Sequence, residues 1–325
     1  MRAYLSPEEL KTFYQFDQHR VIVNALTTWV LILGALGTWA VFGEWWLFVA
    51  CFVVIAVQQN RLTTFVHEAS HFNVVQRNKS LNDLISDMAF GAPILVSIGS
   101  YRRRHINHHQ HQGVYGLDDE INDRYIIRGR GLVVNLAQCL VGMRAASAFF
   151  SHARAVQGPT EGASGSSGLR HWGLVGVVNL GLMIYCWAMG NVLAYPLLWL
   201  LPLGTLTTAL ITLRVIGEHQ SEEYARRGEE NFSASLAVTV TRTIPAGFIE
   251  RAAFGPLNFC YHNEHHLFPG VPYAQLPQLH RLLQERGYYN DHPECFAPSY
   301  AAVLWSRIRG PAPDRAAAPQ QPQKI

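Results

Sequence analysis

The sequence predicts an all-α integral membrane protein, with four transmembrane helices in two hairpins and a cytosolic helical cap that holds a metal site. Of the 325 residues, 49% are hydrophobic and 15% are charged, whereas charged residues make up about a quarter of a typical soluble domain. Four predominantly apolar stretches are each about 20 residues long, and histidines recur in clusters with helical spacing. A net charge of +3 is low for a nucleic-acid-binding protein, so no nucleic-acid partner is expected.

Residues 1–20 form a polar segment that contains a helix-start pattern. Ser6 is a good N-cap residue, and Pro7 suits the first helical position, where its missing N–H costs nothing. Two glutamates follow, as is common in the first turn of a helix. We expect a short amphipathic helix that lies on the membrane surface.

Two tight turns, at residues 43–44 and 190–191, divide the apolar stretches into pairs. Each stretch is about long enough to cross a bilayer at 1.5 Å per residue. Neither turn contains Lys or Arg, and the positive-inside rule therefore places both termini and all the histidine clusters in the cytoplasm. The expected spans are residues 21–42, 45–66, 172–189 and 192–213.

The remaining segments set the limits of the membrane domain, which we place at residues 21–309. Residues 84–98 are apolar but too few for a full span, and they include Pro93. We expect them to form a re-entrant or interfacial helix. Residues 310–325 are rich in Pro, Ala and Gln and are expected to be a disordered tail.

Histidines with helical spacing are the strongest chemical signal in the sequence. Side chains three or four residues apart share a helix face, so the spacings H-x3-H and H-x2-H-H each present convergent imidazoles. Nine imidazoles are too many for one metal ion that must leave room for a substrate, and they suit two ions with four or five nitrogens each. The set comprises His67, His71, His105, His108, His109, His219, His262, His265 and His266.

The clusters HEASH, HINHH and HNEHH resemble, in order, the three histidine boxes of the integral-membrane fatty acid desaturase and hydroxylase superfamily. The resemblance covers roughly residues 20–290. RVIGEH resembles the element that supplies an additional histidine ligand, which would be His219. Some family members have an asparagine four residues before that histidine, where this chain has Val215. Asn258, four residues before His262, is an alternative candidate for holding a metal-bound water.

The resemblance implies two non-haem iron ions, with O2 as co-substrate, in a fatty acid or lipid acyl-chain desaturase. The substrate would be a membrane lipid or an acyl thioester. The sequence contains no HPGG element and no Cys-rich iron–sulfur motif, so we expect a separate electron donor, ferredoxin-like or cytochrome-b5-like with a reductase. No catalytic residue beyond the metal ligands is expected. Nearby carboxylates should hold the imidazoles in one tautomer, and the candidates are Asp118, Asp119, Glu218 and Glu264.

Two other functions stay open at this stage. A hydroxylase or ketolase of a lipid, alkyl or terpenoid substrate would share the first hydrogen abstraction and differ only in the next step. HEASH also matches the H-E-x-x-H pattern of zinc proteases, in which Glu68 would be the general base. That interpretation leaves the other histidine clusters without a role. The oligomeric state is left open.

Overall fold

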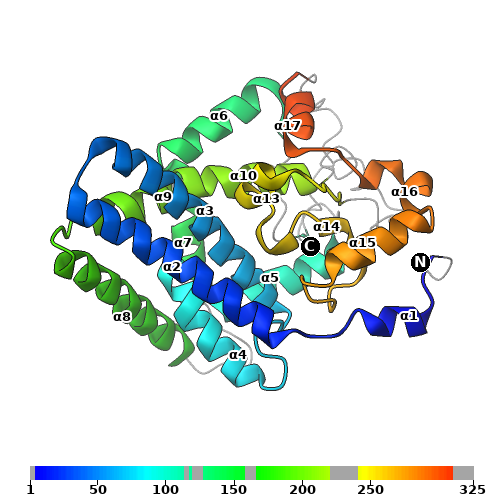
Figure 1. Ribbon diagram of the computed structural model, residues 1–325, viewed down its shortest axis with the longest axis horizontal. Helices are drawn as coiled ribbons and strands as arrows, with labels where there is room; N and C mark the ends of the chain where they lie inside the picture. Colours follow the sequence, from blue (N-terminus) through cyan, green and yellow to red (C-terminus); the bar gives the residue numbers. More distant parts are fainter. Residues whose placement is uncertain (1–3, 113–116, 119–126, 158–165, 220–240, 310–325) are drawn as a thin grey trace, which may run out of the picture. The chain divides into compact units, whose positions relative to one another are not determined.

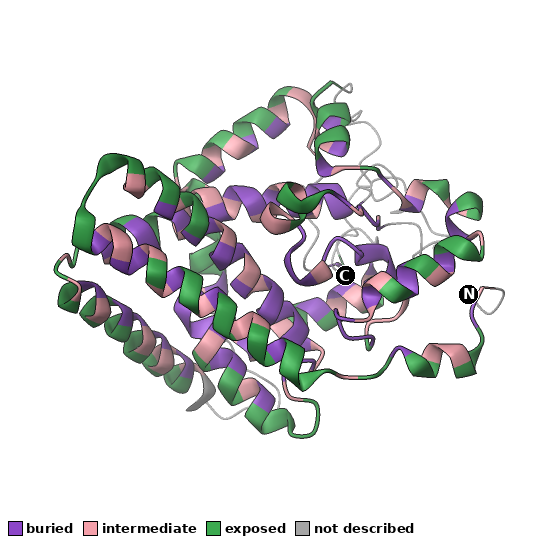
Figure 2. Ribbon diagram, in the orientation of Figure 1, coloured by how far each residue is buried: buried purple, intermediate pink, exposed green. Residues whose placement is uncertain are grey.

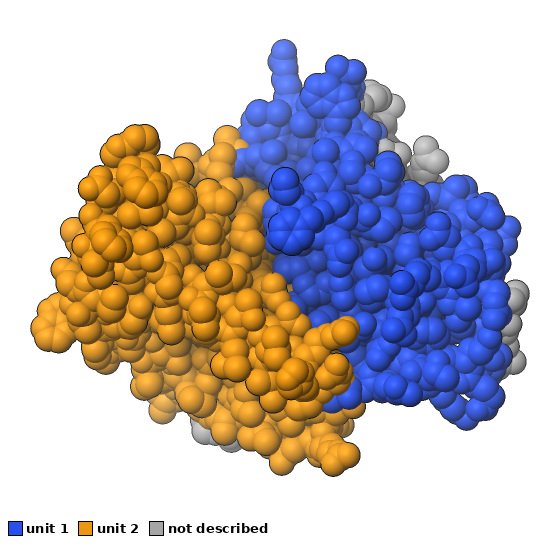
Figure 3. Space-filling view, viewed as in Figure 1, with its two compact units in different colours: residues 1–16, 103–136, 211–325 blue, residues 17–102, 137–210 orange. Residues whose placement is uncertain are grey.

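The computed structural model describes residues 4–112, 117–118, 127–157, 166–219 and 241–309, and the regular secondary structure in these residues is helical (Figure 1). Two compact units are distinguished (Figure 3). Unit 1 comprises residues 1–16, 103–136 and 211–325, and unit 2 comprises residues 17–102 and 137–210. Three helices run across these boundaries, namely α5 (Ile98–His111), α6 (Gly129–Leu140) and α10 (Leu206–Glu218).

Unit 2 begins with helices α2 (Gln18–Phe42) and α3 (Trp45–Ser70), which pack against each other. The Asp17 side chain caps α2, and Gly43, with a φ of 69°, ends it in the left-handed conformation that favours glycine. The predicted spans 21–42 and 45–66 are thus helical. Helix α3 continues past residue 66, so His67 lies on the span helix itself.

The second half of unit 2 contains helix α8 (Ser166–Ala188) and a broken helix. The broken helix consists of η3 (Tyr195–Leu200), α9 (Leu201–Gly204) and the start of α10, with an interruption at Thr205. η3 is a π-helix that contains Pro196, which removes one backbone donor and disturbs the regular ladder.

A buried amide connects these helices inside unit 2. Asn179 Nδ2 donates to the Ala92 carbonyl (3.0 Å), and its Oδ1 accepts from Tyr195 Oη (3.1 Å) and Trp199 Nε1 (3.2 Å). Satisfying this amide matters because an unpaired polar group in an apolar interior costs several kcal/mol.

Among the residues that the structure describes, four helical segments are long and apolar enough to cross a membrane. Many of their apolar side chains are exposed, as expected of a surface that faces lipid rather than water (Figure 2). Examples are Val30, Val177 and Trp187. The segments are Gln18–Phe42, Trp45–Ser70, Gly168–Ala188 and Tyr195–Glu218.

The chain between α3 and the second histidine cluster is bent by 91°. Helix α4 (Lys79–Ser86) passes into η1 (Asp87–Gly91) and η2 (Ala92–Ile94), and Leu95 then adopts a φ of 64°. The Asp87 carboxylate accepts from the Ile98 backbone N–H (2.9 Å) and so stabilises the start of α5. Residues 84–98 therefore do not form one straight helix, and their re-entrant or interfacial position stays a prediction. Helices α6 and α7 (Met143–Gln157) form a second bent pair, at 73°.

Unit 1 contains several short helices near the C-terminus: α13 (Phe248–Ala253), α14 (His262–Leu267), α15 (Leu276–Glu285), α16 (Tyr288–Asp291) and α17 (Tyr300–Arg309). Backbone pairing supplements these helices, because Thr243 forms isolated bridges with both Tyr261 and Phe296. Three segments distant in sequence are therefore held together around Thr243.

The N-terminal helix α1 (Pro7–Thr12) begins with the predicted cap, and Ser6 and Glu9 form a complete capping box. The segment packs against the C-terminal part of unit 1. Arg286 donates to Glu9 (2.6 Å), and Tyr4 Oη donates to Asp291 (2.6 Å). A membrane-surface location for residues 1–20 stays a prediction, and the predicted tail at 310–325 lies outside the described residues.

Candidate metal centre

The first histidine cluster lies at the end of helix α3 in unit 2. His67 and His71 are one helical turn apart, and their ring centroids lie 5.1 Å from each other. His67 is buried, and its Nδ1 lies 3.2 Å from Oε1 of the buried Glu68. Because a carboxylate there accepts the Nδ1 proton, Nε2 of His67 keeps its lone pair for a metal ion.

Arg102 connects this end of α3 to the start of α5 within unit 2. Its guanidinium donates to the carbonyls of Ala69 (2.8 Å) and Ser70 (2.9 Å), and to the Asp83 carboxylate (2.9 Å). It also lies 4.0 Å from the centroid of the Phe72 ring. One side chain thus holds the last turn of α3 against the beginning of the helix that carries the second cluster.

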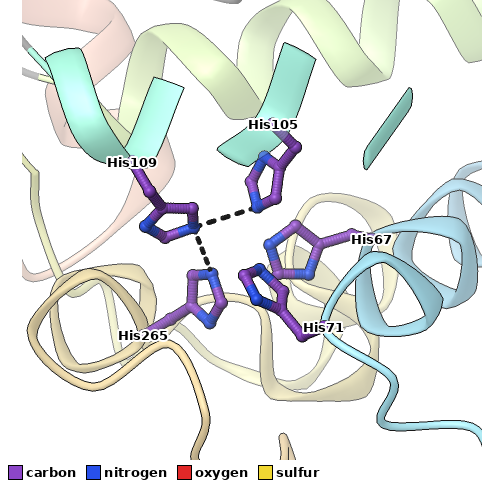
Figure 4. Close-up of side chains that lie close together, drawn as sticks. All are labelled: His67, His71, His105, His109 and His265. Atoms are coloured by element: carbon purple, nitrogen blue, oxygen red, sulfur yellow. Dashed lines mark hydrogen bonds between the residues drawn. The ribbon is translucent and has the colours of Figure 1, made fainter. Parts of the chain in front are cut away.

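The second cluster lies on α5, where His105, His108 and His109 share a face as the spacing predicts. His105 and His108 are buried, and His109 is half-buried. The His109 ring is directed toward two other imidazoles (Figure 4): its Nε2 lies 3.0 Å from His105 Nε2 and 3.1 Å from His265 Nε2. Three imidazoles of unit 1 therefore converge on one point. Figure 4 also shows the first-cluster histidines, His67 and His71.

A second group of imidazoles converges elsewhere in unit 1. His219 directly follows α10, and its Nε2 lies 3.3 Å from His108 Nε2 and 3.2 Å from His262 Nε2. His262 Nε2 in turn lies 3.0 Å from His266 Nε2. These four rings come from α5, α10 and α14, so three separate elements contribute to one cluster.

The tautomers of two of these rings point to a cation. His108 Nδ1 donates to Asp118 Oδ2 (2.8 Å), and His219 Nδ1 donates to the Val215 carbonyl (3.2 Å). In a neutral imidazole, a proton on Nδ1 leaves a lone pair on Nε2. Two Nε2 lone pairs therefore face each other at 3.3 Å, which is repulsive unless a positive ion lies near both.

Burial keeps other members of the cluster neutral. It lowers the pKa of His262 and of His266 well below the usual value of 6.5, and the neighbouring imidazoles lower it further. Both rings are therefore neutral near pH 7, which is the form that binds metal. In the described residues, both groups of convergent ligand atoms consist of histidine, a donor set that suits iron, zinc, copper or nickel rather than magnesium or calcium.

The carboxylates predicted to orient imidazoles have different partners. Asp118 contacts His108 as predicted. Glu218 accepts instead from the Tyr300 hydroxyl (2.8 Å), and Glu264 accepts from Thr243, Tyr289 and His280 Nδ1. Asp119 lies outside the described residues.

Asn258 is engaged away from the imidazoles. Its Oδ1 accepts from Arg251 (2.9 Å), and its Nδ2 donates to the Tyr273 carbonyl (3.1 Å). Its role in holding a metal-bound water stays a prediction. The backbone of Val215, at the position where some family members have asparagine, supplies the acceptor for His219.

Sequence reasoning missed several supporting residues. The H-E-x-x-H pattern gives Glu68 only the role of a protease base, although a carboxylate beside a histidine is a recognisable signal within HEASH itself. Tyr289, Tyr300 and His280 had no such signal, because each hydrogen-bonds to Glu264 or Glu218 only through the packing of segments distant in the chain.

Comparison with known proteins agrees with the geometry. Residues 43–297 match the fatty acid desaturase family. The chain is 26% identical over 256 residues to the dihydrorhizobitoxine desaturase of Bradyrhizobium elkanii, covering 75% of this chain and 70% of that protein.

Two animal proteins are also similar. The sphingolipid delta(4)-desaturase of Drosophila melanogaster is 25% identical over 287 residues, covering 82% of this chain and 74% of that protein. The sphingolipid delta(4)-desaturase/C4-monooxygenase of Mus musculus is 25% identical over 299 residues, covering 89% and 78%. The match to the family extends over most of the chain and includes all three histidine clusters together with His219. The chain therefore belongs to the fatty acid desaturase family.

Proposed function

We propose that this protein is an O2-dependent desaturase that uses two histidine-bound iron ions to introduce a double bond into a lipid hydrocarbon chain. The observation that carries the proposal is the convergence of Nε2 lone pairs from His108 and His219, held by Asp118 and the Val215 carbonyl. Family membership supports the reaction class. The names of the similar proteins support a substrate such as a sphingolipid or another lipid with a saturated chain.

We assign all nine histidines as ligands. His105, His109 and His265 would bind one ion, and the resemblance of HEASH to the first histidine box supports His67 and His71 as further ligands. The second ion would be bound by His108, His219, His262 and His266.

The bound irons would activate O2 for the removal of hydrogen from an unactivated C–H bond, with electrons from a separate donor protein. The chain's own residues perform the remaining tasks. Asp118 and Glu68 hold the Nδ1 protons of His108 and His67 and thereby direct Nε2 toward the ions. Burial of most of the cluster excludes water, which would otherwise compete for the ligand positions.

The membrane arrangement is part of the proposal. We infer two hairpins, Gln18–Phe42 with Trp45–Ser70 and Gly168–Ala188 with Tyr195–Glu218, with both termini and the metal centre in the cytoplasm. The absence of Lys and Arg from the turns at 43–44 and 190–191 supports this orientation. Electrons would come from a separate donor protein, ferredoxin-like or cytochrome-b5-like.

The test is expression in a host whose lipids are profiled by mass spectrometry, with a panel of saturated acyl lipids and dihydrosphingolipids supplied. We expect a product that has lost two hydrogen atoms, and its loss in His265→Ala. His111→Ala is the matched control, because His111 lies on α5 but its Nδ1 contacts the Asn107 carbonyl instead of the cluster. Purified protein that contains no iron would contradict the proposal, as would a product profile unaffected by His265→Ala.

A monooxygenase is the second candidate, because the name of the mouse relative includes both desaturase and C4-monooxygenase activity. Both reactions begin with the same hydrogen abstraction, and substrate placement then decides between a second abstraction and oxygen transfer. The same experiment separates them, since a monooxygenase product gains one oxygen atom. Zinc in place of iron, with peptide cleavage in the absence of O2, would instead favour the protease interpretation of HEASH.

A further inference from the structure

The two residues inside the third box that are not histidine are completely buried. In HNEHH, Asn263 and Glu264 are each 0% exposed. At 100° per residue, Glu264 lies on the opposite side of α14 from the three imidazoles. The second box differs, because in HINHH the side chain of Ile106 is exposed. The face of α14 opposite the imidazoles is therefore packed in the protein interior, although the HNEHH motif is defined only by its histidines.

Glu264 is the centre of that attachment. It accepts hydrogen bonds from Tyr289 Oη, from Thr243 Oγ1 and from His280 Nδ1, the last at 2.6 Å. The neighbouring Asn263 accepts from Tyr288 Oη (3.0 Å). Helix α14 has only six residues and cannot hold three ligands in place by its own hydrogen bonds.

The same arrangement recurs at His219. Its neighbour Glu218 is also 0% exposed and accepts from Tyr300 Oη at 2.8 Å. Gly217 makes room for this tyrosine, because a Cβ at that position would lie 2.7 Å from Tyr300 Cδ1. Glu250 in turn accepts from the Tyr300 backbone N–H (3.1 Å) and fixes the start of α17. In both Glu-His pairs, which are far apart in sequence, the glutamate thus accepts a hydrogen bond from a tyrosine.

Both tyrosines come from one short stretch, residues 289–300, that is itself joined to the third box. The Cys295 carbonyl accepts from the Thr243 N–H (2.8 Å), and the Ala297 N–H donates to the Thr243 carbonyl (3.0 Å). Burial, followed by the adjacent carboxylate, raises the pKa of Tyr289 and of Tyr300 well above the usual range, so both stay O–H donors.

We propose that Tyr289 and Tyr300 are positioning residues that together form a clamp. Tyr289 holds Glu264 and so fixes the imidazoles of His265 and His266. Tyr300 holds Glu218 and so fixes the imidazole of His219. They contact no imidazole of the cluster in the described contacts, so their action passes through Glu264 and Glu218. A buried carboxyl oxygen that loses its tyrosine donor is left without that hydrogen bond, and the glutamate shifts toward another partner and moves the adjacent histidine. The proposal builds on the metal-ligand role of these histidines given under Proposed function.

The experiment measures imidazole accessibility in metal-free purified protein, by the rate of diethylpyrocarbonate modification of each histidine peptide. Tyr289→Phe should raise the rate at His265 and His266, and Tyr300→Phe the rate at His219, each by about tenfold, as loss of one buried hydrogen bond allows. Tyr185→Phe is the control, because it removes a phenol hydrogen bond to the Leu33 carbonyl in unit 2 and should change neither rate.

Two further variants separate a clamp from general destabilisation. Tyr300→Phe/Glu218→Gln and Tyr289→Phe/Glu264→Gln remove the carboxyl group together with the tyrosine hydroxyl, so protection should return at least in part. Unchanged rates in the single variants, or equal increases at every histidine, would overturn the clamp. Iron content is measured in parallel. If the wild-type protein contains no iron but the tyrosine variants change the modification rates as expected, only the proposed function is contradicted. If the wild-type protein contains iron but the tyrosine variants leave the modification rates unchanged, only the clamp is contradicted.

Discussion

At the residue scale, the centre depends on which nitrogen of each imidazole carries the proton. Asp118 holds a proton on His108 Nδ1, and a backbone carbonyl does the same for His219. These two acceptors differ in kind, since the carboxylate can be replaced by mutation and the carbonyl cannot. Asp118 is therefore the side chain through which the tautomer hypothesis can be tested.

Asp118→Asn should weaken metal binding by about 10- to 100-fold, the usual cost of losing a carboxylate that orients a histidine ligand. The amide can still accept from Nδ1 but carries no charge, so ligand basicity falls while the shape is kept. Iron content after dialysis against graded chelator measures the effect. Gln110→Ala, which changes an exposed side chain on α5, is the control. Equal iron retention in both variants would contradict the assigned role.

A glycine provides a second test at this scale. Gly217→Ala would place a Cβ 2.7 Å from Tyr300 Cδ1, closer than van der Waals contact allows. Overpacking of a buried site usually costs about 1–3 kcal/mol, so the unfolding midpoint should fall. Thermal unfolding in detergent measures it. Gly34→Ala is the matched control on α2, because its Cβ would have no atom within 4 Å. A larger fall in Gly34→Ala would show that the Tyr300 contact is unimportant.

At the scale of elements, Arg102 joins α3 to α5. Its guanidinium uses three kinds of contact at once, namely backbone carbonyls, the Asp83 carboxylate and the Phe72 ring. The planar fork of arginine suits this combination, and lysine, with a single ammonium, cannot reproduce it.

Arg102→Lys should therefore lower stability by about 1.5–3 kcal/mol, since it loses charge-assisted hydrogen bonds in a partly buried position. It should also reduce iron content, because the first and second clusters lie on the two helices it joins. Thermal unfolding and metal analysis measure the two effects. Arg104→Lys, two residues later and exposed, should change neither, and equal effects in both variants would argue against the joining role.

At the scale of the whole molecule, membrane topology decides whether all the histidine clusters lie on the same side of the membrane. Labelling with a membrane-impermeant maleimide in intact cells tests it, since the five native cysteines are buried. Glu44→Cys and Asn191→Cys, in the two turns, should be labelled from outside. Gln110→Cys, exposed on α5, should be labelled only after permeabilisation. Labelling of the two turns from opposite sides would rule out two hairpins.

Local patterns in the sequence were enough to predict the long apolar helices and the helix faces that the histidines share. Apolar length predicted the four candidate span helices, and the intervals within HEASH, HINHH and HNEHH predicted which imidazoles share a face. Both are short-range properties, because the period of a helix is fixed by neighbouring residues. Boundaries were less accurate: helix α3 extends to Ser70 rather than 66, since polar residues at its end pack in the protein interior.

Only the tertiary structure decided what holds the imidazoles in place. Glu264 and Tyr289 are 25 residues apart, and Glu218 and Tyr300 are 82 apart. No local period links such pairs, because a tyrosine finds its carboxylate through the packing of α16 and α17 against the rest of unit 1. The sequence by itself thus predicted clusters of convergent imidazoles, through the number and spacing of histidines, and the resemblance to the desaturase family implied the reaction class. The structure determined the tautomers and the buried supports, because these depend on contacts between segments distant in the chain.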